Sequence, residues 1–204
     1  MNLVDRAKNI LITPKTEWEV IKNEQSSTAD LFTKYAMILA IIPVVATIIG
    51  FSIIGISYGF GVSFKWPLSS SILHGVLSYI LNLVAIYVIA LAVDALAPSF
   101  GSTKNLDASL KVVLYSYTAL FIAGIFMIFP MIAWLALLVS LYTFYLLYLG
   151  LKIVKDTPQD KLVGYLVVTI LISIVVYVII SSVVNAIAAP SLGLEGLKNF
   201  DFGN

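Results

Sequence analysis

A serine between two glycines is the first feature of this sequence that could do chemistry. The string GISYG, residues 55–59, matches the Gly-x-Ser-x-Gly pattern of serine hydrolases and places Ser57 at the nucleophile position. That pattern works on a turn that leads from a strand into a helix, whereas here it ends a long apolar run. His74 could lie on the same side, but Asp94 would be about 30 Å further along the same helix and could not orient it. We therefore expect no catalysis at Ser57, and we expect the small residues to let this helix end pack closely.

Metal and cofactor sites are not expected either. A protein metal site needs three or four ligands, and the chain has one histidine, His74, and no cysteine. We expect His74 to form hydrogen bonds near the membrane surface. The missing cysteines also leave no disulfide framework and no thiolate chemistry.

Most of the sequence is too apolar for a soluble domain. Apolar residues make up 60% of the 204 residues, charged residues make up 11%, and the mean hydropathy is +1.02. One soluble core could not bury that much apolar surface, so the chain is predicted to lie in a lipid bilayer. The net charge of +1 gives no indication of a nucleic-acid partner.

Five apolar runs, each about 20 residues or longer, predict five transmembrane helices. They cover residues 35–57, 71–97, 110–129, 131–151 and 162–188. Pro130 separates the third run from the fourth, and because proline breaks the helical hydrogen-bond ladder, we expect a tight helical hairpin there. The predicted fold class is therefore an all-α integral membrane protein, with a five-helix membrane domain over residues 31–189.

The basic residues predict how the chain is oriented in the membrane. Ten of the twelve fall on one side of the predicted bilayer, which the positive-inside rule identifies as the cytoplasmic side. The amino terminus is therefore expected in the cytoplasm and the carboxyl terminus outside, with an external tail over residues 190–204. The ten are Arg6, Lys8, Lys15, Lys22, Lys34, Lys104, Lys111, Lys152, Lys155 and Lys161, and the other two are Lys65 and Lys198.

The first 30 residues predict a short amphipathic arm that lies on the cytoplasmic membrane surface. In NLVDRAKNILI, residues 2–12, the apolar side chains share one face of a helix, while charged residues such as Asp5, Arg6 and Lys8 face away. This basic amphipathic pattern favours binding to anionic lipid. The alternative is a solvated arm with only transient helix.

A second short helix is expected at residues 13–24, TPKTEWEVIKNE. Thr16 and Glu19 have the spacing of a capping box, and Trp18 and Ile21 supply an apolar face. Ser27, with Asp30 three residues later, repeats the capping signal just before the first span.

Large and small residues alternate between the first two spans, in YGFGVSFKWP at residues 58–67. Aromatic residues gather at the headgroup level of membranes, so we expect an aromatic anchor here. A short re-entrant turn is the alternative.

Few polar residues fall deep within the predicted spans. Asn82 lies near the middle of the second span, and Asn185 lies nearer the outer end of the fifth. We expect Asn82 to form hydrogen bonds between helices, and the alternative is that it lines a polar path for an ion or small solute. The spans show no series of acids for a proton relay, a feature common in coupled transport.

Tyrosines mark the cytoplasmic ends of the third and fourth spans. In SLYTFYLLYLGLK, three tyrosines lie three residues apart and follow one side of a helix toward Lys152. With nearby charged residues they predict a polar cluster on the inner side of the bundle, or alternatively the usual placement of tyrosine at a membrane interface. The members of this candidate cluster are Asp94, Asp107, Lys111, Tyr115, Tyr117, Tyr142, Tyr145, Tyr148 and Lys152.

Asp94 lies within one turn of Pro98, where the second span returns to water. The next span begins with Lys111 at a similar depth. We therefore predict that Asp94 and Lys111 form an ion pair or share a hydrogen-bond network, with Tyr115 or Tyr148 as further members, that fixes the inner ends of the helices.

Over residues 30–185 the sequence resembles the Yip family, the Ypt/Rab-interacting membrane proteins, and in particular its short prokaryotic members. Asp30, Leu31 and Phe32 match part of the family motif DLYGP, and residues 115–118, YSYT, match part of YGYSL. The resemblance implies a five-helix domain with a cytosolic amino terminus. Eukaryotic members bind prenylated Rab-type GTPases in vesicle traffic between the endoplasmic reticulum and the Golgi. Thr33 and Lys34 replace the Gly-Pro of the first motif, so the resemblance implies the fold rather than this partner.

The expected function is non-enzymatic association with other membrane proteins or with lipids, in a role resembling membrane organisation or trafficking. Small residues suit close helix packing, namely Ala46 with Gly50, Ala119 with Ala123, and Ala136 with Ser140. A membrane-protein partner or a second copy of the chain would fit this reading, and the expected location is the plasma membrane of a prokaryote. The alternative is a transporter or channel with a path near Asn82, Asp94 and the tyrosines.

Overall fold

Five helical segments of the described chain are long and apolar enough to cross a membrane, which confirms the predicted number of spans. The structure is a computed structural model that describes residues 2–59, 62–196 and 200–201, with side chains for residues 2–56 and 64–188. The spans are Thr28–Ile54, Leu68–Phe100, Leu106–Ile128, Leu135–Ile153 and Gln159–Ala188.

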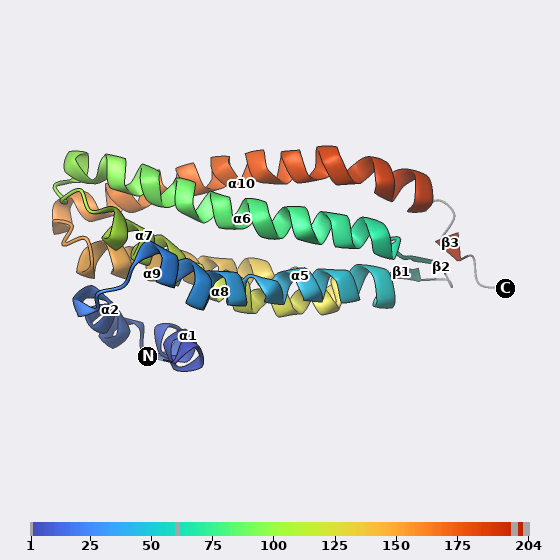
Figure 1. The fold of residues 1–204 in the computed structure, drawn as a ribbon, viewed down its shortest axis with the longest axis horizontal. Helices are drawn as coiled ribbons and strands as arrows, with labels where there is room; N and C mark the ends of the chain where they lie inside the picture. Colours follow the sequence, from blue (N-terminus) through green and yellow to red (C-terminus); the bar gives the residue numbers. More distant parts are fainter. Residues whose placement is uncertain (1, 60–61, 197–199, 202–204) are drawn as a thin grey trace.

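The spans run along the long axis of the molecule in two layers (Figure 1). Helices α6 (Leu68–Leu96) and α10 (Gln159–Gly196) lie side by side along much of their length and form one layer. The other layer contains α5 (Ile41–Ile48), α8 (Thr118–Ala123) and α9 (Leu135–Ile153). The third span, which α7 (Leu106–Ser116) begins, has the largest buried share of the five, so it forms the centre of the bundle.

The first span is assembled from short helical pieces, and Pro43 accounts for one of the breaks between them. Proline has no N–H and its ring clashes with the carbonyl four residues earlier, so the ladder breaks at Ala40. The pieces are α3 (Thr28–Leu31), the π-helical turns η1 (Phe32–Ala36) and η2 (Ile49–Ile54), α4 (Met37–Leu39) and α5.

Small residues bring the first and third spans into close contact. A Cβ atom added at Gly50 would lie 1.9 Å from the carbonyl oxygen of Met127, and one added at Gly124 would lie 2.5 Å from the Pro43 ring. The predicted packing residues Ala46, Gly50, Ala119 and Ala123 are buried, whereas Ala136 and Ser140 are only half-buried. Close approach therefore joins these two spans, as small residues allow in membranes.

The predicted helical hairpin at Pro130 is confirmed. The third span ends in η4 (Gly124–Ile128), and Phe129 then takes an extended conformation with φ −114°. A short 3₁₀ turn, η5 (Pro130–Ile132), leads into α9.

The segment after the first span forms a strand hairpin rather than only an aromatic anchor or a re-entrant turn. Strand β1 (Ile56–Gly59) pairs antiparallel with β2 (Val62–Phe64), which pairs with β3 (Phe200–Asp201). The Trp66 ring centre lies 4.6 Å from that of Phe51 and 5.3 Å from that of His74. Helix α10 also continues to Gly196, so the region expected to be an external tail begins as helix and includes strand β3.

Two short helices precede the bundle. Asn2 caps α1 (Leu3–Ile12), and its side chain accepts a hydrogen bond from the Val4 amide at 3.1 Å. Helix α2 (Pro14–Asn23) begins at a proline after Thr13, so the expected capping box at Thr16 and Glu19 is wrong. Proline is favoured at the first helical position because that position needs no N–H.

The capping signal before the first span is confirmed. The Ser27 hydroxyl accepts a hydrogen bond from the Asp30 amide at 3.1 Å.

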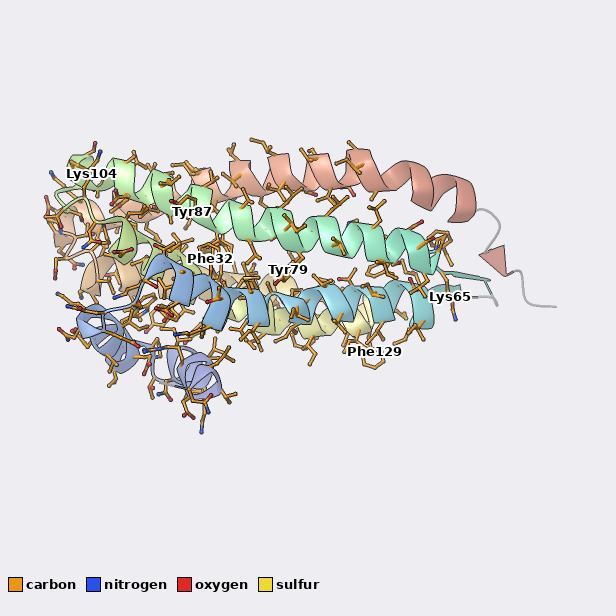
Figure 2. The ribbon with its side chains drawn as sticks, viewed as in Figure 1. Phe32, Lys65, Tyr79, Tyr87, Lys104 and Phe129 are labelled. Atoms are coloured by element: carbon orange, nitrogen blue, oxygen red, sulfur yellow. The ribbon has the colours of Figure 1, made fainter. Side chains whose placement is uncertain are left out.

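The first helix and the last strand lie at opposite ends of the bundle (Figure 1). We call these the arm end, which carries α1 and α2, and the sheet end, which carries β1 to β3. Lys104 lies at the arm end and Lys65 at the sheet end (Figure 2). An odd number of spans places the segments before the first span and after the last span on opposite sides of the membrane, which agrees with this separation.

Candidate functional site

The arm packs against the bundle with part of its apolar face. Ile10, Trp18 and Ile21 are fully buried, and α1 and α2 contact α7, α8 and α9. A Cβ atom added at Gly150 would lie 3.1 Å from the Trp18 ring, so glycine lets α2 approach α9 closely. These residues therefore face protein, although the sequence predicted that the apolar face would lie on lipid.

Arg6 is buried, which corrects the prediction that it faces away from the apolar side. Its guanidinium donates to Glu17 Oε1 at 2.5 Å and also to the Glu24 carboxylate. Its Cζ atom lies 5.4 Å from the centre of the Tyr115 ring. Because α1 and α2 fold back on each other, Glu17 of α2 and Glu24 at its carboxyl-terminal cap can reach the arginine and compensate its buried charge.

Lys111 joins this group from the bundle side. Its ammonium donates to the backbone carbonyls of Ile21, at 3.3 Å, and of Glu24. These carbonyls belong to the carboxyl-terminal end of α2, which has unpaired acceptors and the negative end of the helix dipole. We call the group of Arg6, Glu17, Glu24, Lys111 and Tyr115 the arm clamp.

The predicted pairing of Asp94 with Lys111 is therefore wrong. Asp94 is bound instead by Lys155, whose ammonium lies 3.4 Å from Asp94 Oδ1. The side chain of Lys111 contacts the arm, whereas that of Asp94 contacts Lys155, Asn105 and Ser109. The rotation of each helix about its axis is set by packing, which the depth of a residue does not reveal.

Asp94 and Lys155 form a second group with the loop that follows the second span. Asp94 Oδ1 accepts from the Asn105 amide at 2.7 Å and from the Ser109 hydroxyl at 3.2 Å. Lys155 donates to the Ser109 hydroxyl at 2.9 Å and to the Thr103 carbonyl at 2.9 Å. We call Asp94, Thr103, Asn105, Ser109 and Lys155 the loop network, because it joins both loops that connect spans at this end.

Burial changes the acid–base behaviour of Lys155. Its side chain is 1% exposed, and this burial lowers its pKa from the ordinary value of 10.5, while the nearby Asp94 carboxylate opposes the change. The lysine is compensated by the Asp94 carboxylate and by three further hydrogen-bond acceptors, the Thr103 and Asn105 carbonyls and the Ser109 hydroxyl. Such an arrangement stabilises a loop.

Further contacts close the loop network. Ser102 and Thr157 share a hydrogen bond of 2.8 Å between their hydroxyls, and Thr157 also donates to the Leu151 carbonyl at 2.8 Å. The Tyr165 hydroxyl donates to the Val93 carbonyl, and its ring stacks on Phe100 with centres 4.7 Å apart.

The tyrosines of the predicted cluster take separate positions. The Tyr115 ring lies edge-on to Tyr35 and Trp18 within the arm clamp, and the Tyr142 hydroxyl donates to the Leu11 carbonyl of the arm at 2.7 Å. Tyr117 marks the interruption between α7 and α8 and packs against the core. Tyr145 and Tyr148 have other surroundings again, so the five tyrosines do not form one site.

The remaining members of the predicted cluster lie at or near the surface of the protein. Tyr145 is 40% exposed, and the Tyr148 hydroxyl accepts from Gln159 at 3.4 Å. Asp107 accepts from the Thr28 hydroxyl at 3.2 Å. Lys152 borders a shallow groove between α2 and α9.

The three polar residues singled out within the spans, His74, Asn82 and Asn185, form hydrogen bonds within their own helices. The Asn82 amide donates to the Ser78 carbonyl of its own helix at 2.7 Å, which corrects the expected bond between helices. The carbonyl one turn earlier is always within reach of such a side chain in a helix. Asn185 lies 3.4 Å from the Ser181 hydroxyl, and His74 Nδ1 lies 3.5 Å from that of Ser78.

The GISYG string follows a helix and enters strand β1. This order is the reverse of the strand-to-helix turn that a nucleophile elbow requires. The side chain of Ser57 lies outside the described residues.

Several residues of the two groups escaped the sequence reasoning. The sequence predicted that Arg6 faces away from the apolar side and used Lys155 only in the count of basic residues, and it gave Glu17 and Glu24 no role. Asn105 carried a usable signal, because an asparagine just before a helix is a typical cap, and its side chain does accept from the Ala108 amide at 3.0 Å.

Comparisons with known proteins agree with this architecture. A model of the Yip1 domain family matches residues 8–181. The inner membrane protein YohC of Escherichia coli strain K12 is 27% identical over 167 residues, which cover 80% of this chain and 85% of YohC. The protein of the same name from E. coli O6:H1 matches to the same extent. No solved structure matches the chain significantly.

Proposed function

Because this chain belongs to the Yip1 domain family, we propose that it is a non-catalytic membrane protein that acts by associating with other membrane proteins or with lipids at its arm end. One observation carries this proposal. The arm is held on the bundle by buried contacts, and yet it presents the exposed apolar residues Val4, Ile12 and Val20 beside exposed lysines. Exposed apolar and basic residues on one short element suit a membrane surface or a partner.

The location follows from the five spans and from the relative in E. coli, which is named an inner membrane protein. The chain is a multi-pass protein of a prokaryotic plasma membrane. We propose that the arm end faces the cytoplasm, because ten of the twelve basic residues belong to the elements of that end or to the loops that reach it.

The orientation can be tested with single cysteines because the chain has none of its own. Lys65→Cys and Lys104→Cys place one thiol at each end (Figure 2). A membrane-impermeant maleimide should label the Lys65→Cys variant in intact cells and the Lys104→Cys variant only after permeabilisation. The opposite pattern would reverse the proposed orientation.

Transport is the less supported alternative. Its proposed path relied on Asn82 and Asp94, and the first is bonded within its own helix while the second is engaged by Lys155. A flux assay in liposomes on the wild type and Asp94→Asn would test it. Movement of an ion or small solute that Asp94→Asn changes would favour transport over association.

Photo-crosslinking tests the association directly. A crosslinking amino acid at Ile12, in the arm, can be compared with one at Met131, an equally exposed apolar residue near the sheet end. In native membranes we expect a discrete product from Ile12 that Met131 does not give. The same products from both positions would contradict a role for the arm end.

A further inference from the structure

A shallow groove lies between the second helix of the arm and the fourth span. Its walls come from α2 and from the last turns of α9, two elements far apart in the sequence. We call it the lysine groove, and its lining residues are Lys15, Thr16, Glu19, Leu149, Lys152 and Ile153.

The groove carries unpaired positive charge. Within the part of the chain whose side chains are described, neither Lys15 nor Lys152 lies within ion-pair distance of an acid. Glu19 is the only acid of the lining, and it too forms no ion pair there. Two cations facing one anion leave the groove with a net positive charge that suits a phosphate.

The backbone of α2 adds to this field. Thr13, the residue at its cap position, makes no side-chain capping hydrogen bond. Its hydroxyl donates instead to the backbone carbonyl of Asn9 in α1, at 3.2 Å. Lys15 and Thr16 lie in the first turn, where amides have no helical acceptor. The positive end of the helix dipole therefore acts in the same direction as the two lysines.

The groove also lies where a lipid headgroup would lie. Lys152 is in the last turn of a span that crosses the membrane, and Leu149 and Ile153 form the apolar part of the lining. Deeper along the same side of α9, at helical spacing, the exposed residues are Tyr145, Leu141 and Leu138. An exposed apolar stripe thus leads from the charged groove toward the middle of the membrane.

We propose that the lysine groove binds the phosphate of an anionic phospholipid, whose acyl chains lie along Leu138, Leu141 and Tyr145. Lys15 and Lys152 pair with the phosphate oxygens, and the Thr16 hydroxyl donates to one of them. This inference rests on the proposed association of the arm end, and it names the lipid class and the residues that recognise it. Because one lysine comes from the arm and the other from the bundle, a bound lipid also holds the arm in place.

Native mass spectrometry of the full chain in neutral detergent provides the test. The wild type is titrated with phosphatidylglycerol, with zwitterionic phosphatidylcholine, and with glycerol 3-phosphate, which carries the phosphate without acyl chains. We expect adducts with phosphatidylglycerol well above those with phosphatidylcholine. Equal binding of the two lipids, or competition by glycerol 3-phosphate at the same concentration as phosphatidylglycerol, would overturn the lipid assignment.

Matched variants locate the site. Lys15→Ala with Lys152→Ala should weaken phosphatidylglycerol binding about tenfold, as expected for two partly exposed charge pairs. Lys8→Ala with Lys104→Ala removes the same charge from exposed positions at the same end and should change binding less than twofold. Equal loss in both double variants would show diffuse attraction to a basic surface and would contradict the groove.

A third variant gives a gain rather than a loss. Glu19→Gln removes the only negative charge of the lining and should strengthen phosphatidylglycerol binding about threefold, an outcome that misfolding cannot produce. Unchanged or weaker binding would count against the proposal. If the lipid tests fail while Ile12 still gives its discrete crosslink, the groove is wrong and the association at the arm end stands.

Discussion

The arm clamp and the loop network lie at the same end of the molecule, and each buries a lysine supplied by the membrane domain. In the loop network, Lys155 faces a carboxylate as well as carbonyl and hydroxyl oxygens. In the arm clamp, Lys111 donates to the backbone carbonyls of Ile21 and Glu24, while Arg6 binds the carboxylates of Glu17 and Glu24. The first arrangement joins loops between spans, whereas the second joins the arm to the spans.

This difference separates two structural roles. The loop network connects the second, third and fourth spans with the loop before the fifth, so its loss should weaken the bundle itself. The arm clamp connects a peripheral element, so its loss should release that element and leave the bundle folded. The comparison predicts that variants in the loop network destabilise the whole bundle, whereas variants in the arm clamp release only the arm. The size of the change in free energy should differ as well.

The largest effect is expected from Lys155→Met. Removing this cation leaves the partly buried Asp94 carboxylate without its partner, which in buried pairs costs about 3 kcal/mol or more. The free energy of unfolding of the bundle should fall by that amount in denaturant titrations in micelles. Lys161→Met, at an exposed position nearby, is the control and should change it by less than about 0.5 kcal/mol. Similar effects of the two substitutions would show that the network does not hold the bundle.

Arg6→Ala should act on the arm alone. It leaves Glu17 buried without its cation and weakens arm docking by about 2 kcal/mol, or roughly thirtyfold in the population of the open arm. Trypsin cleavage after Lys15 and Lys22 should speed up accordingly, while the bundle keeps its thermal unfolding midpoint.

Lys8→Ala is the control for this experiment because Lys8 is exposed on the same helix. It should leave cleavage after Lys15 and Lys22 unchanged. If Arg6→Ala lowered the midpoint of the bundle as much as Lys155→Met does, the two groups would not be separable.

A smaller effect is expected from Tyr142→Phe. This change removes one hydrogen bond from the fourth span to the Leu11 carbonyl of the arm, worth about 1 kcal/mol. Cleavage of the arm should increase roughly fivefold by the same trypsin assay. Tyr145→Phe alters a neighbouring hydroxyl on a side chain that is 40% exposed, and it should have no measurable effect.

The pH dependence of stability should be the smallest effect. Burial lowers the pKa of Lys155 in the folded chain below its ordinary value of 10.5, so in the alkaline range below 10.5 the unfolded chain binds more protons there. The free energy of unfolding should therefore gain a positive contribution as pH rises through that range. Comparing the pH slopes of the wild type and Lys155→Met isolates this contribution, and identical slopes would contradict it.

Much of the architecture was predictable because it depends on local chemistry. The five spans follow from the length of the apolar runs, and the hairpin at Pro130 follows from a missing N–H. The cap at Ser27 follows from a side chain that reaches an amide three residues away. Each of these depends on residues that are close in the sequence.

The charge pairing was not predictable because it depends on helix rotation and on one unusual turn. Asp156 has a φ of 48°, a left-handed conformation that an aspartate tolerates better than most residues, directly after Lys155. No sequence pattern revealed that this turn occurs there. In the same way, the two separate arm helices were predicted, but the packing of α1 against α2 that buries Arg6 depends on tertiary contacts that no local pattern reveals.

The most direct test of the central claim, that the arm is docked on the bundle at this end, is zero-length crosslinking of the unmodified protein in its membrane. Lys22 Nζ of the arm lies 2.5 Å from Asp156 Oδ1 of the last loop, and both side chains are accessible to a carbodiimide. Lys34 and Asp30 lie 2.5 Å apart within one short segment and serve as the internal reference, because their product does not depend on the arm. We expect mass spectrometry to find a Lys22–Asp156 crosslinked peptide together with the reference product. The reference product without any Lys22–Asp156 product would contradict the docked arm.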